Sequence, residues 1–191
     1  EDFAMYDLQS CTPDELVVQY LKHHGLREDT ISFFYQNTVN DVAYVYNETA
    51  LFTGASTIKV PLAMLYTDMI HEGKLSYQTQ LGFIEEAIEA GGGRTVFDYD
   101  VGMSISVDYL LQQSVLNSDN TATNILLMNY NRFTKDLFRM DYAAFYPKRY
   151  PAAFYSDNLI SAELMLNVMR SLYANSETYA LILHDMLEAE P

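Results

Sequence analysis

The segment Gly54–Tyr66 is the feature that most restricts how this chain can fold. The residues before it, Tyr44–Tyr46, are aromatic and β-branched, as is typical of a strand, whereas the residues after it are apolar at helical spacing. A glycine followed by small and hydroxylated side chains is typical of a tight turn into a helix. We therefore predict that a helix begins near Thr57, with a kink at Pro61 just past its first turn.

Ser56 and Lys59 lie on one face of that predicted helix. Lys59 follows Ser56 by one helical turn, so its amine can reach the serine hydroxyl. A serine becomes a nucleophile at neutral pH when an adjacent base accepts its proton, and a desolvated lysine can be that base. A helix-capping serine followed by a solvated lysine has the same pattern, which occurs by chance about once in a chain of this length. The pair alone therefore leaves both interpretations open.

A second polar motif, Ser118-Asp119-Asn120, lies between two apolar helical segments. All three residue types are good helix caps, which is the structural interpretation of the motif. The triplet is expected by chance in only about a few per cent of such chains. It follows Ser56 by 118 − 56 = 62 residues, so the two motifs are far apart in the chain.

In this order the two motifs resemble those of the serine β-lactamase and penicillin-binding-protein superfamily. They are most similar to class A β-lactamase-like serine hydrolases of Gram-positive bacteria, over Ala55–Ala63 and Ser118–Asn124. Asp157–Met165 is similar to the segment that leaves the family's Ω-loop. The resemblance implies a β-lactamase/transpeptidase-like fold of the α/β (α+β) class, with a helical lobe beside an N-terminal helix and hairpin.

The resemblance also implies roles for the polar residues. Ser56 would attack the carbonyl of an amide or strained lactam and form an acyl-enzyme, with its own backbone N–H as one oxyanion donor. Lys59 would accept the serine proton, and Ser118 would relay a proton to the departing nitrogen.

Three further residues are expected at the same site. Asn120 would bind the substrate's side-chain amide and Lys59, whereas Asp119 would hold the loop through hydrogen bonds to the backbone. Tyr99, in the loop before Ser118, is predicted to border the entrance to the site.

Hydrolysis of an acyl-enzyme is not predicted to be efficient. A class A β-lactamase carries a carboxylate on the Ω-loop that activates water, and this position falls near Ala144–Lys148, which contains no acid. The nearest carboxylates are Asp141 and Asp157, and neither has the surrounding motif. Slow hydrolysis or a lasting acyl-enzyme is the expectation.

Local patterns predict the order of the elements. Thr12 and Pro13 open a helix that Gly25 ends, and strands over 30–35 and 42–46 form a hairpin. Helices are predicted over 57–72, 80–90, 105–116, 119–130, 132–140, 160–174 and 176–189. Glu85, Glu86 and Glu89 are interpreted as a solvated face of the second of these helices.

Two short strands do not make a stable sheet alone. The resemblance implies further C-terminal strands, the first carrying a Lys-Thr-Gly or similar triad, but the sequence contains no such triad. We therefore expect the sequence to be a fragment in which these strands are missing. Residues 1–55 are predicted to belong to the α/β sheet lobe and residues 56–191 to the helical lobe.

Composition narrows the range of partners. The net charge of −15 and the isoelectric point near 4.4 argue against nucleic acid and anionic membranes as partners. Cys11 is the single cysteine and the histidines lack metal-ligand spacing, so we expect no internal disulfide, no metal and no other cofactor. No apolar run is long enough to span a membrane. The resemblance implies an extracellular or cell-surface protein.

The functional prediction is acyl-serine chemistry on β-lactams or peptidoglycan peptides. One alternative is a D,D-peptidase or another amidase or esterase. A second alternative is a surface or sensor domain that recognises penicillins but releases the acyl group slowly or not at all. The sequence does not choose among these, and it leaves the oligomeric state open.

Overall fold

The N-terminal helix and the hairpin form as predicted. A computed structural model describes residues 10–89, 93–133 and 138–189. Helix α1 (Pro13–His23) starts where the Thr12 backbone N–H donates to the carboxylate of Glu15 at 2.8 Å, and it ends at Gly25 with φ +61°. After a short 3₁₀ turn, η2 (Glu28–Thr30), the antiparallel strands β1 (Phe33–Gln36) and β2 (Ala43–Tyr46) pair with Phe33 opposite Tyr46.

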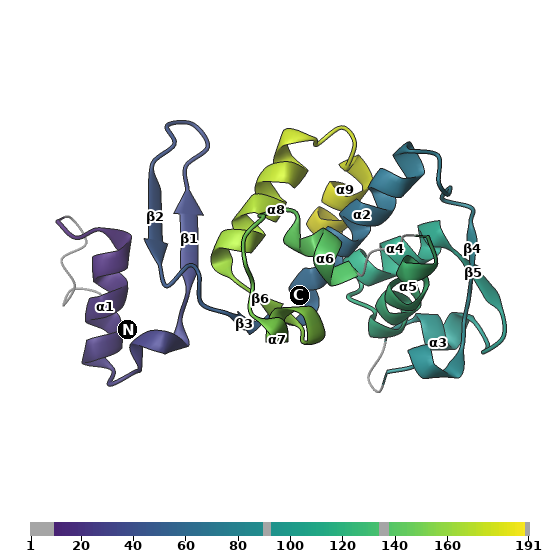
Figure 1. The fold of residues 1–191 in the computed structure, drawn as a ribbon, viewed down its shortest axis with the longest axis horizontal. Helices are drawn as coiled ribbons and strands as arrows, with labels where there is room; N and C mark the ends of the chain where they lie inside the picture. Colours follow the sequence, from purple (N-terminus) through teal and green to yellow (C-terminus); the bar gives the residue numbers. More distant parts are fainter. Residues whose placement is uncertain (1–9, 90–92, 134–137, 190–191) are drawn as a thin grey trace.

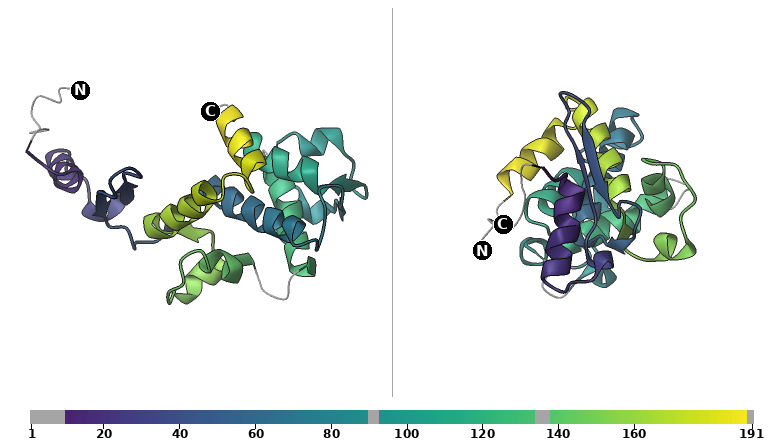
Figure 2. Two further views of the ribbon diagram at one scale, coloured as in Figure 1. Left: turned by 90° about the horizontal axis from the view of Figure 1, so that it is seen from above. Right: turned by 90° about the vertical axis from the view of Figure 1, so that its left-hand side faces the viewer.

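This hairpin lies between two helices. Helix α1 packs against β2, and helix α8 (Ala162–Ala174) packs against β1 on the side of the helical body (Figure 1). Arg170 of α8 donates to the side-chain oxygen of Gln36 at 2.7 Å and lies over the ring of Phe34. Seen from above, α1 and the hairpin form one end of an elongated molecule (Figure 2). The division of the chain at residue 55 into two lobes stays a prediction.

Helix α2 (Lys59–His71) is the centre of the helical body. It is buried on nearly all sides and contacts α4 (Val107–Leu116), α5 (Asn120–Phe133), α6 (Phe138–Ala143) and α9 (Ala180–Glu188). The hydroxyl of Tyr66 donates to the backbone carbonyl of Leu126 at 2.7 Å and so ties α2 to α5 inside the core. An apolar helix that contacts neighbours on all sides is held in place by packing rather than by an amphipathic stripe.

Pro61 lies in the first turn of helix α2, whereas the sequence predicted a position just past that turn. The 3₁₀ turn η3 (Ala55–Ile58) precedes α2, so Pro61 falls in the first turn of the α-helix proper. Backbone N–H groups in a first turn have no α-helical partner, so a proline there does not break an internal α-helical bond. The kink itself stays a prediction.

The predicted helix over 80–90 is wrong. Strand β4 (Gln80–Gly82) pairs antiparallel with β5 (Ser104–Ser106), and the 3₁₀ turn η4 (Glu85–Ala87) follows. Leu81 and Phe83 are buried whereas Gly82 and Ile84 are exposed, which is the two-residue alternation of a strand. The partner strand lies more than twenty residues further along the chain, beyond the reach of a local pattern.

The other helical predictions are confirmed with shifted bounds. The segment predicted over 132–140 divides between the end of α5 and α6, and residues 134–137 lie outside the described residues. Ser106 and Ser161 cap α4 and α8 by accepting from the backbone N–H groups of Tyr109 and Leu164, each at 3.2 Å. The long connection that follows α6 contains the short helix α7 (Ala152–Ser156).

The described residues thus form a mostly helical α+β molecule with three two-stranded sheets. The third sheet pairs β3 (Phe52–Thr53) with β6 (Leu159–Ile160), and it joins the residues before η3 to the start of α8. Within the described part of the chain, no helix is both long and apolar enough to cross a membrane.

Candidate active site

Ser56 lies in the 3₁₀ turn η3, at the end of the short strand β3. The turn is held from the far end of the chain, because the backbone N–H of Gly54 donates to the carbonyl of Asn158 at 2.8 Å and the Asn158 amide donates to the carbonyl of Ala55 at 2.9 Å. A Cβ at Gly54 would lie 2.9 Å from Asn158 Oδ1, so any other residue there would have to displace the Asn158 amide. Ala55 adopts φ +44°, a strained conformation for a residue with a side chain.

Lys59 is buried, with 5% of its surface exposed, at the first position of α2. Its Nζ donates to the Ser118 carbonyl at 2.6 Å, to Ser118 Oγ at 2.9 Å and to Asn120 Oδ1 at 2.8 Å. Burial lowers the pKa of Lys59, and the carboxylates of Asp119 and Glu89 oppose part of that shift. The environment therefore makes the neutral amine more accessible than it is for a lysine in water.

Ser118 connects the other two groups. Its Oγ donates to Ser56 Oγ at 2.9 Å and accepts from Lys59 Nζ, so three side chains form one hydrogen-bonded chain. Within the described residues no direct hydrogen bond joins Lys59 to Ser56, which differs from the contact predicted from their spacing. The amine points to Ser118 and Asn120 because the loop before α5 and the first residue of that helix supply three acceptors. Ser118 itself has φ +51°, so its backbone is strained as well.

Asp119 caps α5 and fixes the loop that carries Ser118. It is fully buried; its Oδ2 accepts from the backbone N–H and the hydroxyl of Thr95, both at 2.7 Å, and its Oδ1 accepts from the N–H of Ala122 at 3.0 Å. A Cβ at Gly93 would lie 2.8 Å from the carboxylate carbon, so the backbone of the preceding loop passes directly over Asp119. Asp119 contacts the backbone and Thr95 and does not line the pocket described next.

Ser56, Lys59 and Asn120 line a pocket of about 330 Å³, whereas Ser118 contacts it only through its hydrogen bonds to Ser56 and Lys59. Its walls are formed by Ala55, Ser56, Ile58, Lys59, Glu89, Asn120, Thr123, Asn124, Leu127 and Asn158. Asn120 uses its Oδ1 to accept from Lys59, and no donation from its Nδ2 is found in the described part of the molecule. That amide nitrogen is therefore available to a ligand.

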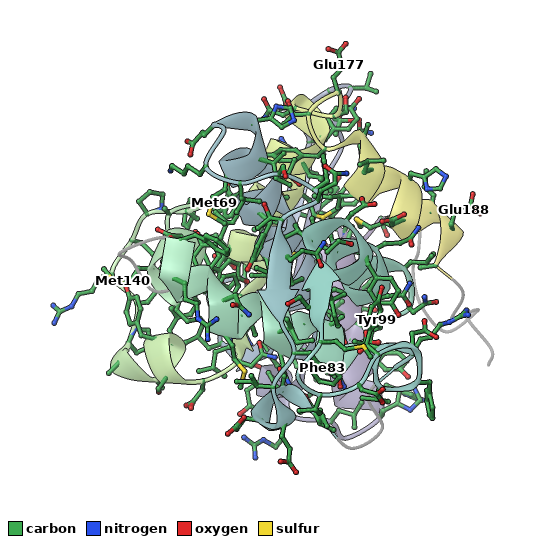
Figure 3. The ribbon with its side chains drawn as sticks, turned by 90° about the vertical axis from the view of Figure 1, so that its right-hand side faces the viewer. Met69, Phe83, Tyr99, Met140, Glu177 and Glu188 are labelled. Carbon is green, nitrogen blue, oxygen red and sulfur yellow. The ribbon has the colours of Figure 1, made fainter. Side chains whose placement is uncertain are left out.

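Tyr99 does not line this pocket. The helix α3 (Thr95–Asp98) ends at Tyr99 with an extended backbone, and the Tyr99 ring packs edge to face on Tyr109 of α4 with centroids 4.9 Å apart. Figure 3 shows this face of the molecule, with Tyr99 and Phe83 labelled. The extended backbone after α3 directs the Tyr99 ring to α4. The position of Tyr99 before Ser118 in the sequence did not predict this packing.

Asn158, Asn124 and Glu89 are among the pocket residues that were not predicted as site residues. Asn158 comes from the segment after α7, Asn124 lies one turn beyond Asn120 on α5, and Glu89 follows η4. The i, i+4 spacing of Asn120 and Asn124 was a signal that could have found the second asparagine. Glu89 was interpreted as part of a solvated helix face; it is exposed, but no helix forms there and its side chain reaches the pocket wall.

The Ω-loop region places no carboxylate in the pocket. Phe145 and Tyr146 pack against the core, and Lys148 forms an ion pair with Glu163 of α8. Asp141 accepts from the hydroxyl of Tyr130 at 2.7 Å, and neither it nor Asp157 lines the pocket. Among the described residues, no group of three or more His, Cys, Asp or Glu side chains is arranged to hold a metal ion.

Solved structures with similar folds are β-lactamases and penicillin-binding proteins. The chromosome-encoded β-lactamase of Vibrio parahaemolyticus superposes with a TM-score of 0.72 at 18% identity, over 93% of this chain and 70% of that one. PBP-A superposes with a TM-score of 0.69 at 16% identity, over 84% and 63%. The D-alanyl-D-alanine carboxypeptidase DacD from Francisella tularensis superposes with a TM-score of 0.63 at 21% identity, over 79% and 38%.

The chain thus spans less than two thirds of the length of PBP-A and of the carboxypeptidase. Among curated protein sequences, none matches the chain.

Fold and site together define a protein of the β-lactamase/transpeptidase-like class, as the two sequence motifs predicted. The family model described as "Beta-lactamase enzyme family" matches residues 17–188. The chain belongs to this family.

Proposed function

We propose that this protein forms an acyl-enzyme on Ser56 with β-lactams or with the amide of a peptidoglycan peptide. The observation that carries the proposal is the chain of hydrogen bonds from Ser56 Oγ through Ser118 Oγ to the buried amine of Lys59. The structural interpretation of the motif, a capping serine and a solvated lysine, does not predict that the hydroxyl of Ser118 joins the two side chains. PBP-A supports the choice of ligand, since a variant of it has been solved as an acyl-enzyme complex with penicillin G.

Acylation requires Lys59 in its neutral form. A charged ammonium has three donors, and the three acceptors around Nζ occupy them all, so it can neither donate to Ser56 nor accept a proton. Burial favours loss of one proton, and the lone pair that this exposes can accept from Ser118 Oγ. Because a hydroxyl both donates and accepts, Ser118 can then accept from Ser56.

The proposed steps balance in protons. Ser56 Oγ attacks the carbonyl carbon while its proton passes through Ser118 to Lys59, and the oxyanion is stabilised by the backbone N–H of Ser56. When the carbon–nitrogen bond breaks, the nitrogen takes a proton from Ser118, which takes one from Lys59. Ser118 and Lys59 then carry the same protons as before the reaction, and Ser56 is acylated.

Hydrolysis of the acyl-enzyme is proposed to be slow. It requires a base that directs water at the ester, and residues 141–157 supply no carboxylate to the pocket. The one carboxylate among the described lining residues, Glu89, accepts from Asn124 one turn along α5 from Asn120. The trapped acyl-enzyme is therefore the form that we expect to accumulate. A penicillin-recognising surface or sensor domain would use the same chemistry, whereas a D,D-peptidase would need a faster second step.

This proposal places the protein outside the cell membrane, at the cell surface or beyond it, because peptidoglycan lies there. The partners are a small β-lactam or a peptide. No step in the scheme uses a metal or another cofactor.

A fluorescent penicillin tests the proposal on the full chain. We expect one equivalent of label that survives denaturation, is lost in Ser56→Ala and persists for hours after the free penicillin is removed. Ser176→Ala, which changes an exposed serine away from the pocket, is the matched control and should label normally. Absence of covalent label on the wild-type protein, or equal labelling of Ser56→Ala, would refute acylation at Ser56.

A further inference from the structure

The pocket carries only two charged side chains among its described lining residues, Lys59 and Glu89. The amine of Lys59 is fully engaged by Ser118 and Asn120. Glu89 is exposed to solvent, so its carboxylate is the charge that a bound ligand can meet. A pocket with one available negative charge favours a ligand that carries a positive one.

Glu89 is held in place by α5. Its Oε2 accepts from Asn124 Nδ2 at 3.2 Å, and its backbone N–H donates to the hydroxyl of Thr121 at 3.4 Å. The same Asn124 nitrogen also donates to the carbonyl of Ala87 at 3.1 Å, which fixes the amide between η4 and Glu89. Both ends of the residue are therefore positioned against the first turns of α5, and the carboxylate keeps acceptor capacity for a further donor.

The positions of Asn120 and Asn124 along α5 indicate where the Glu89 carboxylate lies relative to the reacting amide. Asn120 and Asn124 are one turn apart on the pocket wall, which corresponds to about 6 Å along the helix axis. Under the proposed function the free amide of Asn120 binds the acyl-side amide of the substrate. The substituent on that acyl side then extends along α5 to Asn124 and the carboxylate that it holds.

We infer that Glu89 selects substrates whose acyl side chain carries a protonated amine, and disfavours those that carry a carboxylate. The inference rests on the proposed acylation of Ser56 and specifies the substrate class of that site. The partner chemistry is an amide or lactam with an aminoacyl substituent, such as a peptide with a diamino acid before the reacting bond. Glu89 acts here as a specificity-determining residue and takes no part in moving protons.

Three penicillins that share one nucleus test the inference. Ampicillin adds an amine to the side chain of penicillin G, and carbenicillin adds a carboxylate to the same position. The second-order rate constant for acylation of Ser56 is measured for each by intact-protein mass spectrometry. For an exposed ion pair of up to about 1 kcal/mol, we expect ampicillin to react about two- to fivefold faster than penicillin G, and carbenicillin slower. The difference should shrink at high salt.

Glu89→Gln should make the acylation rate constants of the three penicillins more nearly equal. Because Glu89 also raises the pKa of Lys59, this substitution changes the rate with every substrate, so the ratio between substrates is the quantity to compare. Glu86→Gln removes the same charge from an exposed neighbour outside the pocket and should keep the wild-type ratios.

The outcomes separate the two proposals. Acylation of the wild-type protein at equal rates by all three penicillins would overturn the inference about Glu89 and leave the proposed function standing. Ratios that Glu89→Gln and Glu86→Gln reduce equally would also overturn it, because net charge would then be the cause. Failure of all three penicillins to acylate Ser56 would overturn the proposed function and the inference with it.

Discussion

Replacement of Asp119 tests whether the active-site loop is built on its carboxylate. The side chain is fully buried and accepts three hydrogen bonds, from the backbone N–H of Thr95, the hydroxyl of Thr95 and the backbone N–H of Ala122. Asp119→Ala removes both acceptor oxygens and with them all three hydrogen bonds. A buried donor without a partner costs about 1–3 kcal/mol, and the threonine hydroxyl can rotate to find another acceptor. Two unpaired backbone donors therefore predict a loss of about 2–6 kcal/mol of unfolding free energy.

Asp119→Asn is the finer perturbation, because it changes one oxygen to an amide nitrogen. In either orientation of the amide, one of the two backbone donors faces a donor and remains unpaired. The expected loss is about 1–3 kcal/mol, which lies between the wild type and Asp119→Ala. Asp100→Asn, at an exposed position in the same region, should change stability by less than about 0.5 kcal/mol.

Urea denaturation followed by circular dichroism measures these differences. Both Asp119 variants should unfold at a lower midpoint with an unchanged dependence on urea, since the surface exposed on unfolding is the same, and Asp100→Asn should unfold close to the wild-type midpoint. The reasoning would be refuted by Asp119→Ala unfolding at the wild-type midpoint, or by Asp119→Asn costing more than Asp119→Ala.

Three other perturbations follow from the same geometry. Gly93→Ala should destabilise by about 1–3 kcal/mol in a urea titration, because its Cβ would lie 2.8 Å from the Asp119 carboxylate carbon; wild-type stability would contradict that close approach. The acylation rate should rise with pH through the lowered pKa of Lys59, and Lys59→Arg should show no such rise because arginine stays charged. Burial lowers the pKa of Lys59 in the folded state below its unfolded value of about 10.4. The free energy of unfolding should therefore increase as the pH rises from the folded pKa to the unfolded pKa. Asn158→Leu should reduce labelling at Ser56 by about 10²-fold, with a loss of stability near 1 kcal/mol, because it frees the Ala55 carbonyl; unchanged labelling would exclude a positioning role.

Sequence patterns predicted the features that depend on neighbours in the chain. The capping of α1 by Thr12 and Glu15, and its end at Gly25, follow from local hydrogen bonding and from the freedom of glycine at positive φ. The pairing of β1 with β2 follows from two apolar runs separated by a short turn. The family and its fold followed from Ser56-x-x-Lys59 and Ser118-Asp119-Asn120, because chemistry restricts which residue types can stand at these spacings.

Tertiary structure decided the rest. Residues 80–82 are a strand only because residues 104–106 pair with them. The Lys59 amine points to Ser118 because Ser118 and Asn120, at the start of α5, bring three acceptors to it. Asn158 lines the pocket because it contacts Ala55, 103 residues away in the chain. Glu89 lines it because it contacts Asn124, 35 residues away. Helix caps and turns are stabilised within a few residues, so the sequence determines them directly. A pocket wall is assembled from separate elements, and its members are fixed only when the core has brought those elements together.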